Sequence, residues 1–469
     1  MNPLYNRVSL AALLAASAVG PSTADASGFA LLEQSASRLG TAFAGTAAAA
    51  DDATTLFFNP AGMTLIEGNQ LAAGLASGIE ITSEFSNAGS TAAFGQPSGG
   101  TGGDAGGWNF VPGVYLTTPL TDDVTIGLGI NAPFGLQLVY EDGWVGRFQA
   151  VHSEIKTINF NPSIAWQVND RFSVGAGVSY QHLQAELTNA VNYSAAVAQG
   201  VQQLVARGQL PAAAAPGVIA ANVGLEGDAR VRGDDTGWGF NVGFLFDVSN
   251  ATRIGLAYRS AVEYNVGGTI NFTPPAAIPN PIGAGIVAAA SASGAPLSSG
   301  PVSVDLKVPD SAILSLRQSV NPKLAVLADV AWTGWSSVQE LRVVRDSGAT
   351  VSVTPERWRD VMRYALGATY ELNDQLTLRT GLAYDTTPVP DETRTPRLPD
   401  TNRTWAAIGA RWQPSQALAF DFAYAHLFSD TVPLNQNAGN TAVSGLLLGE
   451  QHSDIDIISA QLTYRFGAR

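Results

Sequence analysis

Hydrophobic and polar residues alternate along much of the chain with a period of two. Within 362–372 and 376–385, large apolar side chains occupy every second position, and small, polar or charged residues lie between them. This pattern predicts β-strands with one face in an apolar medium and the other face in a polar one. A half-buried soluble sheet and a membrane barrel both meet that description.

Short turn segments between the alternating runs give the number of strands. Each contains Asn, Asp, Pro or Ser, and they lie at 120–123, 168–171, 248–251, 320–323, 372–375 and 413–416. With both chain ends on one side, six short turns require seven long connections and 14 strands. An even number lets an antiparallel barrel close without an unpaired edge in lipid. The expected strands are about 69–84, 108–119, 122–140, 152–168, 171–189, 228–248, 251–272, 302–320, 322–345, 356–372, 375–388, 402–413, 417–429 and 452–466.

Aromatic residues favour the membrane barrel over the soluble sheet. They recur near the expected strand ends, where a bilayer interface would hold them. The examples are Trp108, Phe110, Trp166, Trp238, Phe246, Trp332, Trp335, Trp405, Trp412 and Phe466.

Composition narrows the class further. The chain has 469 residues, 14% of them charged, no cysteine and a formal net charge of −14. No run of 18 apolar residues follows the first thirty, which argues against a helical membrane protein. The missing cysteines exclude disulfides and thiol chemistry, and the negative charge argues against a nucleic-acid partner. We therefore expect one large β domain.

The first 26 residues read as a secretory signal. Arg7 supplies a positive start, 8–20 an apolar core, and Ala24-Asp25-Ala26 a small-x-small cleavage pattern. We expect residues 1–26 to be removed, residues 27–68 to form a separate N-terminal unit, and the barrel to occupy 69–469.

The unit at 27–68 is Ala- and Gly-rich and carries four short motifs in order. They are Gly28-Phe29, Leu39-Gly40-Thr41-Ala42-Phe43-Ala44-Gly45, Ala50-Asp51-Asp52-Ala53 and Asn59-Pro60-Ala61. This segment resembles the N-terminal hatch of the FadL family of outer-membrane long-chain fatty-acid transporters. Blocks such as Val308-Pro309-Asp310-Ser311 extend the resemblance over nearly the whole mature chain.

The resemblance implies a fold, a location and a route. The fold is an all-β, 14-stranded antiparallel transmembrane barrel of the bacterial outer membrane, with a hatch of short helices plugging the lumen. Ligand is captured in an outer groove between loops, binds near the mature N-terminus, and leaves sideways by passive transport. Ser27, Gly28 and Phe29 would line the pocket, and Asn59, Pro60 and Ala61 would fix the hatch.

The third expected strand contains an irregularity, Asn131-Ala132-Pro133-Phe134-Gly135. Proline removes a hydrogen-bond donor and glycine weakens a strand, so a bulge or kink should form there. A simple bend at the membrane edge would explain the same residues. The resemblance favours a lateral opening framed by Asn131, Pro133, Phe134 and Gly135.

Arginines are the candidates for binding a carboxylate, because only three of the 25 basic residues are lysines and the planar guanidinium suits carboxylate recognition. The expected strand parity points several arginines into the lumen: Arg253, Arg259, Arg317, Arg363, Arg379, Arg411 and Arg465. Most should pair with lumen acids. We select Arg317, Arg363 and Arg379 as the first candidates for contact with ligand.

Two long loops on the outer face stand out. Residues 190–227 have helical spacing, which predicts a short helical pair broken near Pro211 and Pro216. Residues 273–300 are Pro-, Ala- and Gly-rich and apolar. They suit an exposed interaction site or a low-complexity segment packed on the barrel rim.

Catalysis finds no support in the sequence. His152, His182, His426 and His452 fall into no triad or metal-ligand spacing, and we expect no catalytic residue, metal or cofactor. The expected function is passive uptake of long-chain fatty acids, by a monomer in contact with outer-membrane lipid and lipopolysaccharide. Uptake of aromatic hydrocarbons or other small hydrophobic compounds by the same route is the alternative, and a general porin is a third reading that the hatch disfavours.

Overall fold

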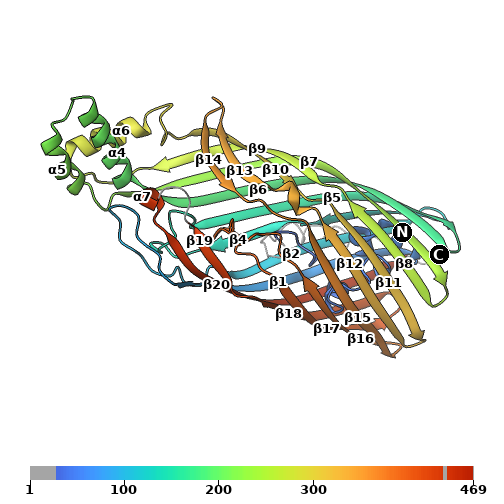
Figure 1. Cartoon of the computed structure of the whole chain (residues 1–469). Coiled ribbons are helices and arrows are strands. Elements are labelled where there is room, and N and C mark those ends of the chain that lie inside the picture. The colour runs from blue at the N-terminus through green and yellow to red at the C-terminus, as the bar shows by residue number, and fades with distance from the viewer. Residues whose placement is uncertain (1–27, 437–440, 468–469) are drawn as a thin grey trace, which may run out of the picture.

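A closed antiparallel barrel forms the body of the molecule in a computed structural model that describes residues 28–436 and 441–467 (Figure 1). The expected signal segment, 1–26, lies outside these residues. Within them, 14 strands follow one another around the barrel, and β1 closes it by pairing with β20 from Asn69↔Phe466 to Asn87↔Gly449. The predicted fold and strand number are confirmed.

Eight of the described spanning strands are continuous, and six are interrupted. The continuous strands are β1 (Asn69–Asn87), β2 (Gly107–Pro119), β5 (His152–Asn169), β6 (Phe172–Asn192), β7 (Glu226–Ser249), β16 (Leu376–Asp385), β17 (Arg403–Ser415) and β20 (Leu447–Phe466). The interrupted ones are β3 (Val124–Asn131) with β4 (Gly135–Val139), β8 (Thr252–Arg259) with β9 (Val262–Thr273), β10 (Gly300–Val308) with β11 (Ser311–Asn321), β12 (Leu324–Thr333) with β13 (Glu340–Arg345), β14 (Thr350–Pro355) with β15 (Val361–Asn373), and β18 (Leu418–Ser429) with β19 (Val432–Gln436).

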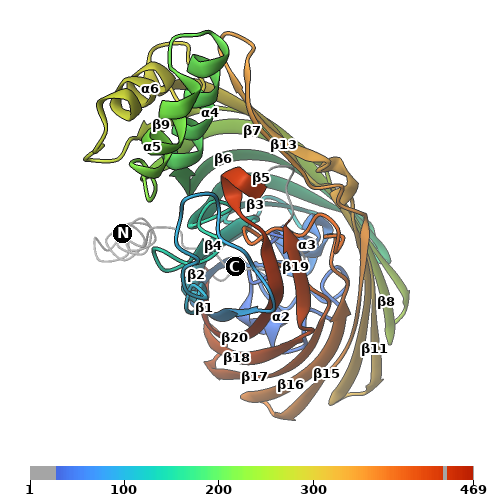
Figure 2. The same cartoon turned by 60° about the vertical axis from the view of Figure 1, so that its left-hand side comes forward.

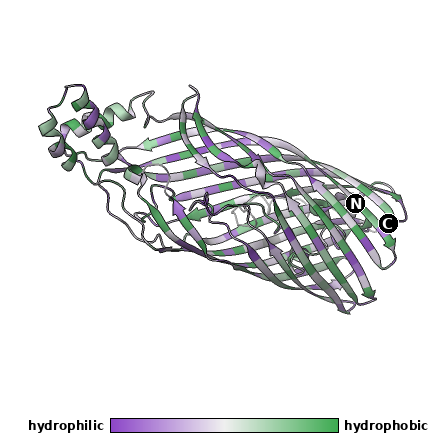
Figure 3. Cartoon of the chain, viewed as in Figure 1, coloured by the Kyte–Doolittle hydropathy of each residue, from purple (hydrophilic) through white to green (hydrophobic). Residues whose placement is uncertain are grey.

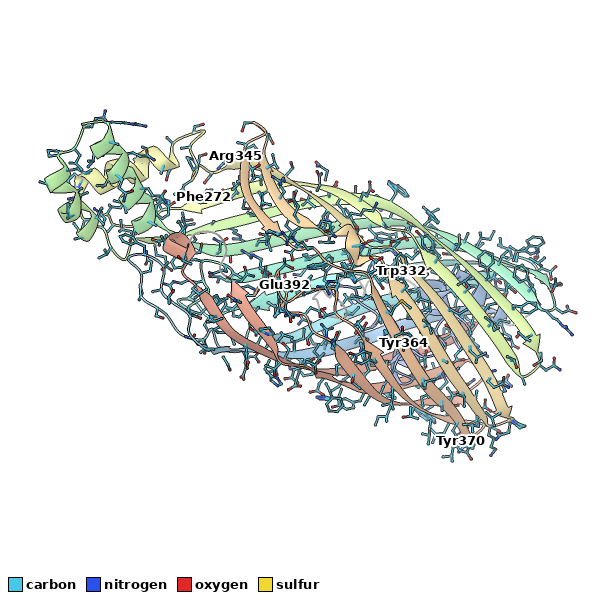
Figure 4. The ribbon with its side chains drawn as sticks, in the orientation of Figure 1. Phe272, Trp332, Arg345, Tyr364, Tyr370 and Glu392 are labelled. Atoms are coloured by element: carbon cyan, nitrogen blue, oxygen red, sulfur yellow. The ribbon has the colours of Figure 1, made fainter. Side chains whose placement is uncertain are left out.

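Side chains along the strands alternate between an apolar outer face and a more polar lumen face, as predicted. On β16, Leu378 and Leu382 are exposed by 41% and 62%, whereas Arg379 is buried in the lumen. Figure 3 shows hydrophobic and hydrophilic residues alternating along the strands. Tyr364 and Tyr370 lie on the outer face of β15, at two levels of the wall (Figure 4). An apolar outer face with aromatic side chains at both levels suits a lipid-facing surface.

Two of the aromatic residues expected at the interface are buried instead. Trp335 and Trp405 are both 0% exposed. Trp405 packs edge-on against Phe43 of the N-terminal segment, and Trp335 packs against Phe29. The expectation was wrong for these two, because Trp405 has lumen parity on β17 and Trp335 follows the end of β12.

The six predicted short turns join strands at one end of the barrel, and the long connections lie at the other (Figure 1). The strict alternation of short and long connections fails once. Residues 346–349 form a short turn between β13 and β14, because these two strands pair as a hairpin from Leu341↔Thr354 to Val344↔Thr350. In outer-membrane barrels the long-loop end is extracellular.

Helices gather at the long-loop end. The segment expected to be a helical pair contains α4 (Tyr193–Ala206), η2 (Ala212–Ala214) and α5 (Ala215–Ala220). The chain breaks at Pro211 as expected, but Pro216 lies in the first turn of α5 and does not break the helix. Residues 273–300 contain a helix that was not expected, α6 (Pro281–Ser291), which packs against α4 and α5. A fourth short helix, α7 (Thr441–Ser444), lies near α4. Among the helices of the described residues, none combines the length and apolarity that a membrane crossing requires.

Residues 28–68, called the hatch below, lie within the ring of strands (Figure 2). They contain α2 (Ala36–Leu39), α3 (Thr55–Phe58) and η1 (Pro60–Leu65). Wall side chains bind the hatch backbone: Asp329 accepts from Gly45 N at 2.8 Å, and Gln70 accepts from Ala53 N at 2.6 Å. These bonds satisfy buried polar groups that short helices leave open.

Candidate functional site

The N-terminal end of the hatch pairs with the irregularity of the third spanning strand. Ala30 and Phe134 form an antiparallel bridge. Leu31 N donates to Pro133 O at 2.8 Å, and Gly135 N donates to Phe29 O at 2.9 Å. The first described residues are therefore held directly against the kink.

An aromatic cage surrounds Phe29. Its ring centroid lies 4.8 Å from that of Trp335, 5.8 Å from Trp358 and 5.9 Å from Phe134, each in an edge-on arrangement. Such pairs add to the stabilisation that apolar burial provides. Gly28 has a φ of +65°, and a Cβ there would lie 2.6 Å from the Trp335 ring, so only glycine suits this position.

A buried carboxyl supports the cage from the connection between β14 and β15. Trp358 Nε1 donates to Glu356 Oε2 at 2.9 Å. The guanidinium of Arg397 is a cation close to this buried carboxyl. Arg397 itself donates to His152 O at 3.2 Å and Ser153 Oγ at 3.1 Å.

An inner cavity of about 100 Å³ adjoins this cage. Hatch residues and wall residues line it together, and most of the lining is apolar: Ala30, Leu31, Leu32, Phe57, Phe58, Pro133, Phe134, Ala257, Pro309, Ile313, Ala331 and Val361. Asn241, Tyr258, Arg259, Ser311, Thr333, Arg363 and Asp385 complete the lining with polar groups.

Two arginines reach the cavity. Arg363 is 6% exposed; its Nη2 donates to Ala42 O, and its Nε has no hydrogen-bond partner among the described residues. Arg259 donates through Nη2 to Phe57 O at 2.7 Å, and its guanidinium lies 4.4 Å from the centre of the Phe57 ring. The strand parity placed both in the lumen, but Arg259 was not among the first candidates.

The other two candidate arginines lie outside this lining. Arg379 pairs with Asp421 of β18 and lies 3.5 Å from Asp51 of the hatch. Arg317 donates to Ser319 Oγ at 2.9 Å. Arg379 thus belongs to a buried ionic network between hatch and wall, which also contains Arg411. Ser27 lies outside the described residues.

The Asn59-Pro60-Ala61 motif docks the hatch on β7 and β6. Asn59 Nδ2 donates to Ala47 O at 2.6 Å and to Phe244 O at 3.0 Å, and its Oδ1 accepts from Ala61 N. Pro60 begins η1, a position where its missing N–H costs nothing. A Cβ at Gly243 would lie 1.9 Å from Asn59 Oδ1, so the motif packs against a wall without side chains at that point.

The segment 131–135 interrupts the wall. β3 ends at Asn131 and β4 begins at Gly135. Within the described residues β4 pairs with β5, whereas β2 pairs with β3 only from Val114 to Pro119. The edges meet again where Val139 N donates to Ala105 O at 2.9 Å. The hydrogen-bonded ladder between the second and third spanning strands is therefore open between these two points.

A larger groove of about 720 Å³ lies at the long-loop end. Its lining comes mainly from α4, α6 and the end of β6, with smaller parts from β7 and β9, and apolar contributions include Leu204, Val231 and Phe272. Arg345 fixes the neighbouring loop by donating to Pro296 O at 3.2 Å and Ser298 O at 2.7 Å; Figure 4 shows Arg345 and Phe272 at this end.

Comparisons with known proteins agree with this architecture. A family model described as outer membrane protein transport protein (OMPP1/FadL/TodX) matches residues 17–466. The long-chain fatty acid transport protein of Escherichia coli (strain CFT073) is 30% identical over 434 residues, covering 92% of this chain and 94% of that protein.

Solved structures give the same picture. A FadL homologue of Pseudomonas aeruginosa superposes with a TM-score of 0.82 at 28% identity, covering 94% of this chain and 100% of that one. The toluene transporter TodX of P. putida has a TM-score of 0.62 at 18% identity, covering 89% and 95%, and shares the fold. The family consists of transport proteins of the bacterial outer membrane, not enzymes. The chain belongs to the FadL/TodX family of outer-membrane transporters of hydrophobic compounds.

Proposed function

We propose that the protein imports long-chain fatty acids passively. Ligand is captured in the outer groove, binds in the inner cavity beside Phe29, and leaves sideways at the kink in residues 131–135. The observation that carries the proposal is the pair Arg259 and Arg363, because two guanidinium groups and only one carboxylate, that of Asp385, line a mostly apolar cavity and leave it an excess of positive charge. That combination suits an amphiphile with an anionic head.

The two parts of such a ligand would gain affinity in different ways. Burial of the acyl chain contributes about 0.8 kcal/mol per methylene. The carboxylate would accept a charge-assisted hydrogen bond from Arg363 Nε, a donor with no partner among the described residues. The net negative charge of the chain gives no long-range attraction for a carboxylate, so recognition of the head group depends on these local arginines.

The cavity is too small for a long acyl chain, since a volume of about 100 Å³ holds only a few groups the size of a water molecule. Phe29 occupies the cage next to it. We infer that ligand displaces the segment 28–31, which also breaks its two hydrogen bonds to Pro133 and Gly135. Binding would thereby loosen the kink at which the ligand leaves.

Aromatic hydrocarbons are the second candidate substrate. The fold is also that of toluene transporters, and the cavity is mostly apolar. A hydrocarbon has no charge to pair with an arginine, however, and its ring gains only a cation–π contact of about 0.5–2 kcal/mol. A carboxylate accepts charge-assisted hydrogen bonds from the same guanidiniums, worth about 1.5–3 kcal/mol each. The arginines therefore support the fatty acid over the hydrocarbon.

The test is uptake of a radiolabelled long-chain fatty acid and of toluene by cells producing the wild type, Arg259→Gln or Arg363→Gln. We expect each variant to bind the acid about tenfold more weakly, the value of one lost hydrogen bond to a charged group, and to import toluene normally. Arg253→Gln is the matched control, because Arg253 lies on the same strand as Arg259 and pairs with Asp247 at 2.7 Å outside the cavity. Toluene uptake without fatty-acid uptake by the wild type would overturn the substrate assignment.

A further inference from the structure

Five uncharged polar side chains form a strip on the lumen wall from the kink to the inner cavity. The amide strip consists of Asn131 on β3, Asn159, Asn161 and Ser163 on β5, and Asn241 on β7. Each is at least nine-tenths buried, with exposures from 0% to 7%. Buried polar groups in this number need hydrogen-bond partners.

Strand register explains why they lie together. Asn131 is opposite Asn159, and Ser163 and Asn241 are both opposite Gly177 of β6. A Cβ at Gly177 would lie 2.2 Å from Ser163 Oγ, 2.6 Å from Asn241 Oδ1 and 2.8 Å from Asn161 Nδ2. Three polar side chains thus converge over a position that has no side chain of its own.

The strip is only partly satisfied by its own members. Asn159 Nδ2 donates to Asn131 Oδ1 at 3.1 Å, and Asn161 Nδ2 donates to Asn241 Oδ1 at 2.9 Å. Five buried atoms have no partner among the described residues: Asn131 Nδ2, Asn159 Oδ1, Asn161 Oδ1, Ser163 Oγ and Asn241 Nδ2. The strip therefore offers both acceptors and donors, without a charge.

Its two ends meet the two features that the ligand must pass. Asn241 lines the inner cavity and is opposite Arg259 in the strand register. At the other end Asn131 is the last residue of β3, directly before the interruption that Ala132, Pro133 and Phe134 make in the wall. A head group leaving the arginines for the kink would move along these amides.

We propose that the amide strip is a transit site for the oxygen head group of a long-chain amphiphile, an acid or an alcohol, between the inner cavity and the lateral opening. This inference rests on the proposed function and adds a second polar site to it. A carboxylate or an alcohol oxygen can accept a hydrogen bond from Asn241 Nδ2. The O–H of a protonated carboxyl group or of an alcohol can donate to Asn159 Oδ1 or Asn161 Oδ1. A hydrocarbon has no group that the strip could bind, so its passage is independent of these residues.

The experiment compares uptake of a long-chain fatty acid, a long-chain alcohol and toluene by cells producing the full chain or a double variant, Asn159→Leu with Asn161→Leu. We expect acid and alcohol uptake to fall by about tenfold, as for the loss of one to two hydrogen bonds, with toluene uptake unchanged. Thr463→Val is the matched control, a polar residue on β20 that is 3% exposed and lies outside the strip. Normal toluene uptake also shows that the double variant is folded in the membrane.

Two results with the double variant overturn the transit site. Unchanged uptake of acid and alcohol means that the strip holds only water, and an equal loss for all three compounds means that it only supports the wall. If wild-type cells take up the alcohol but not the acid, the fatty acid is not the substrate, and alcohol uptake by the double variant still tests the strip. If the wild type imports neither amphiphile, both proposals fall.

Discussion

Phe29 brings together parts of the chain that are far apart in the sequence. Its ring contacts Phe134 at the kink, Trp335 after β12 and Trp358 before β15, and its backbone binds Gly135. Phe29 and the three rings of its cage leave little room for any of these side chains to move, because protein interiors are close-packed. The groups that fix the tryptophans therefore control how tightly the N-terminal segment is held.

Glu356 is such a group, because its Oε2 accepts the hydrogen bond of Trp358 Nε1 at 2.9 Å. Glu356→Leu would leave this buried indole N–H without an acceptor, at a cost of about 1–3 kcal/mol. Glu356→Gln keeps an acceptor of similar size, so we expect a much smaller loss of stability in that variant.

The measurement is the denaturation midpoint of the wild type and of both variants, with Glu392→Leu as the control. Glu392 has a side chain that is 77% exposed, 3.9 Å from Arg359, and its replacement should change stability little. Equal midpoints for Glu356→Leu and Glu356→Gln would show that the hydrogen bond to Trp358 does not hold the cage.

At the scale of elements, the hatch and the wall fit together through glycines. Wall glycines on β16, β8 and β7 have lumen parity, and a Cβ at Gly381, Gly255 or Gly243 would lie about 2 Å from a hatch atom. The approach is backbone against backbone at Gly381 and Gly255, and backbone against the Asn59 side chain at Gly243, with little room for rearrangement. The buried pairs of Arg411 with Asp52 and Asp421 hold the same contact by charge.

Gly381→Ala should displace the hatch. Its methyl group would lie 2.1 Å from the carbonyl of Thr41, and overpacking of this kind costs about 1–3 kcal/mol. We expect the lumen to become permeable to a large polar antibiotic that the wild type excludes. Gly267→Ala on β9 is the matched control, since a Cβ there meets nothing within 4 Å. Equal antibiotic sensitivity of the two variants would contradict the tight hatch contact.

The sequence pattern determined some elements well and others poorly, for physical reasons. Period-two alternation and six turns were enough for the number of strands, because lipid on one side and a lumen on the other enforce that pattern. The interruption at 334–339, which turns Trp335 inward, has no such signature. Helix α6 does have a sequence signature, which the prediction missed. Asn280 caps the helix, with its Oδ1 accepting from Ile282 N at 2.9 Å, and Pro281 is the first helical residue.

Some candidate site residues were also predicted well and others poorly. Parity placed Arg363 and Arg379 in the lumen, yet only Arg363 lines the cavity, because Arg379 lies where the hatch brings Asp51 against the wall. Which arginine meets a cavity depends on the path of the hatch, and strand alternation contains no information about that path. The same holds for the amide strip, which arises from the register of four strands.

At the scale of the whole molecule, the proposed route runs from the outer groove to the inner cavity and then to the kink. The segment 28–31 lines the cavity with Ala30 and Leu31 and is bound to Pro133 and Gly135 of the kink. The proposed route therefore requires that this segment leave Pro133 and Gly135. The chain contains no cysteine, so a disulfide introduced at this contact would have no competitor. Ala30 and Phe134 are suited to it, because they are directly opposed in an antiparallel bridge.

The hydrogen bonds on either side of this pair, Leu31 to Pro133 and Gly135 to Phe29, make it a non-hydrogen-bonded pair. Cα atoms of such pairs lie about 4.5 Å apart, within the range that a disulfide spans. Ala30→Cys with Phe134→Cys should therefore oxidise readily, keep the N-terminal segment on the kink, and stop fatty-acid uptake until a reductant is added. Phe134→Cys alone controls for the loss of the ring and should not respond to reductant. Full uptake by the verified disulfide form would show that ligand passes without moving this segment, and the coupling between binding and the lateral opening would have to be abandoned.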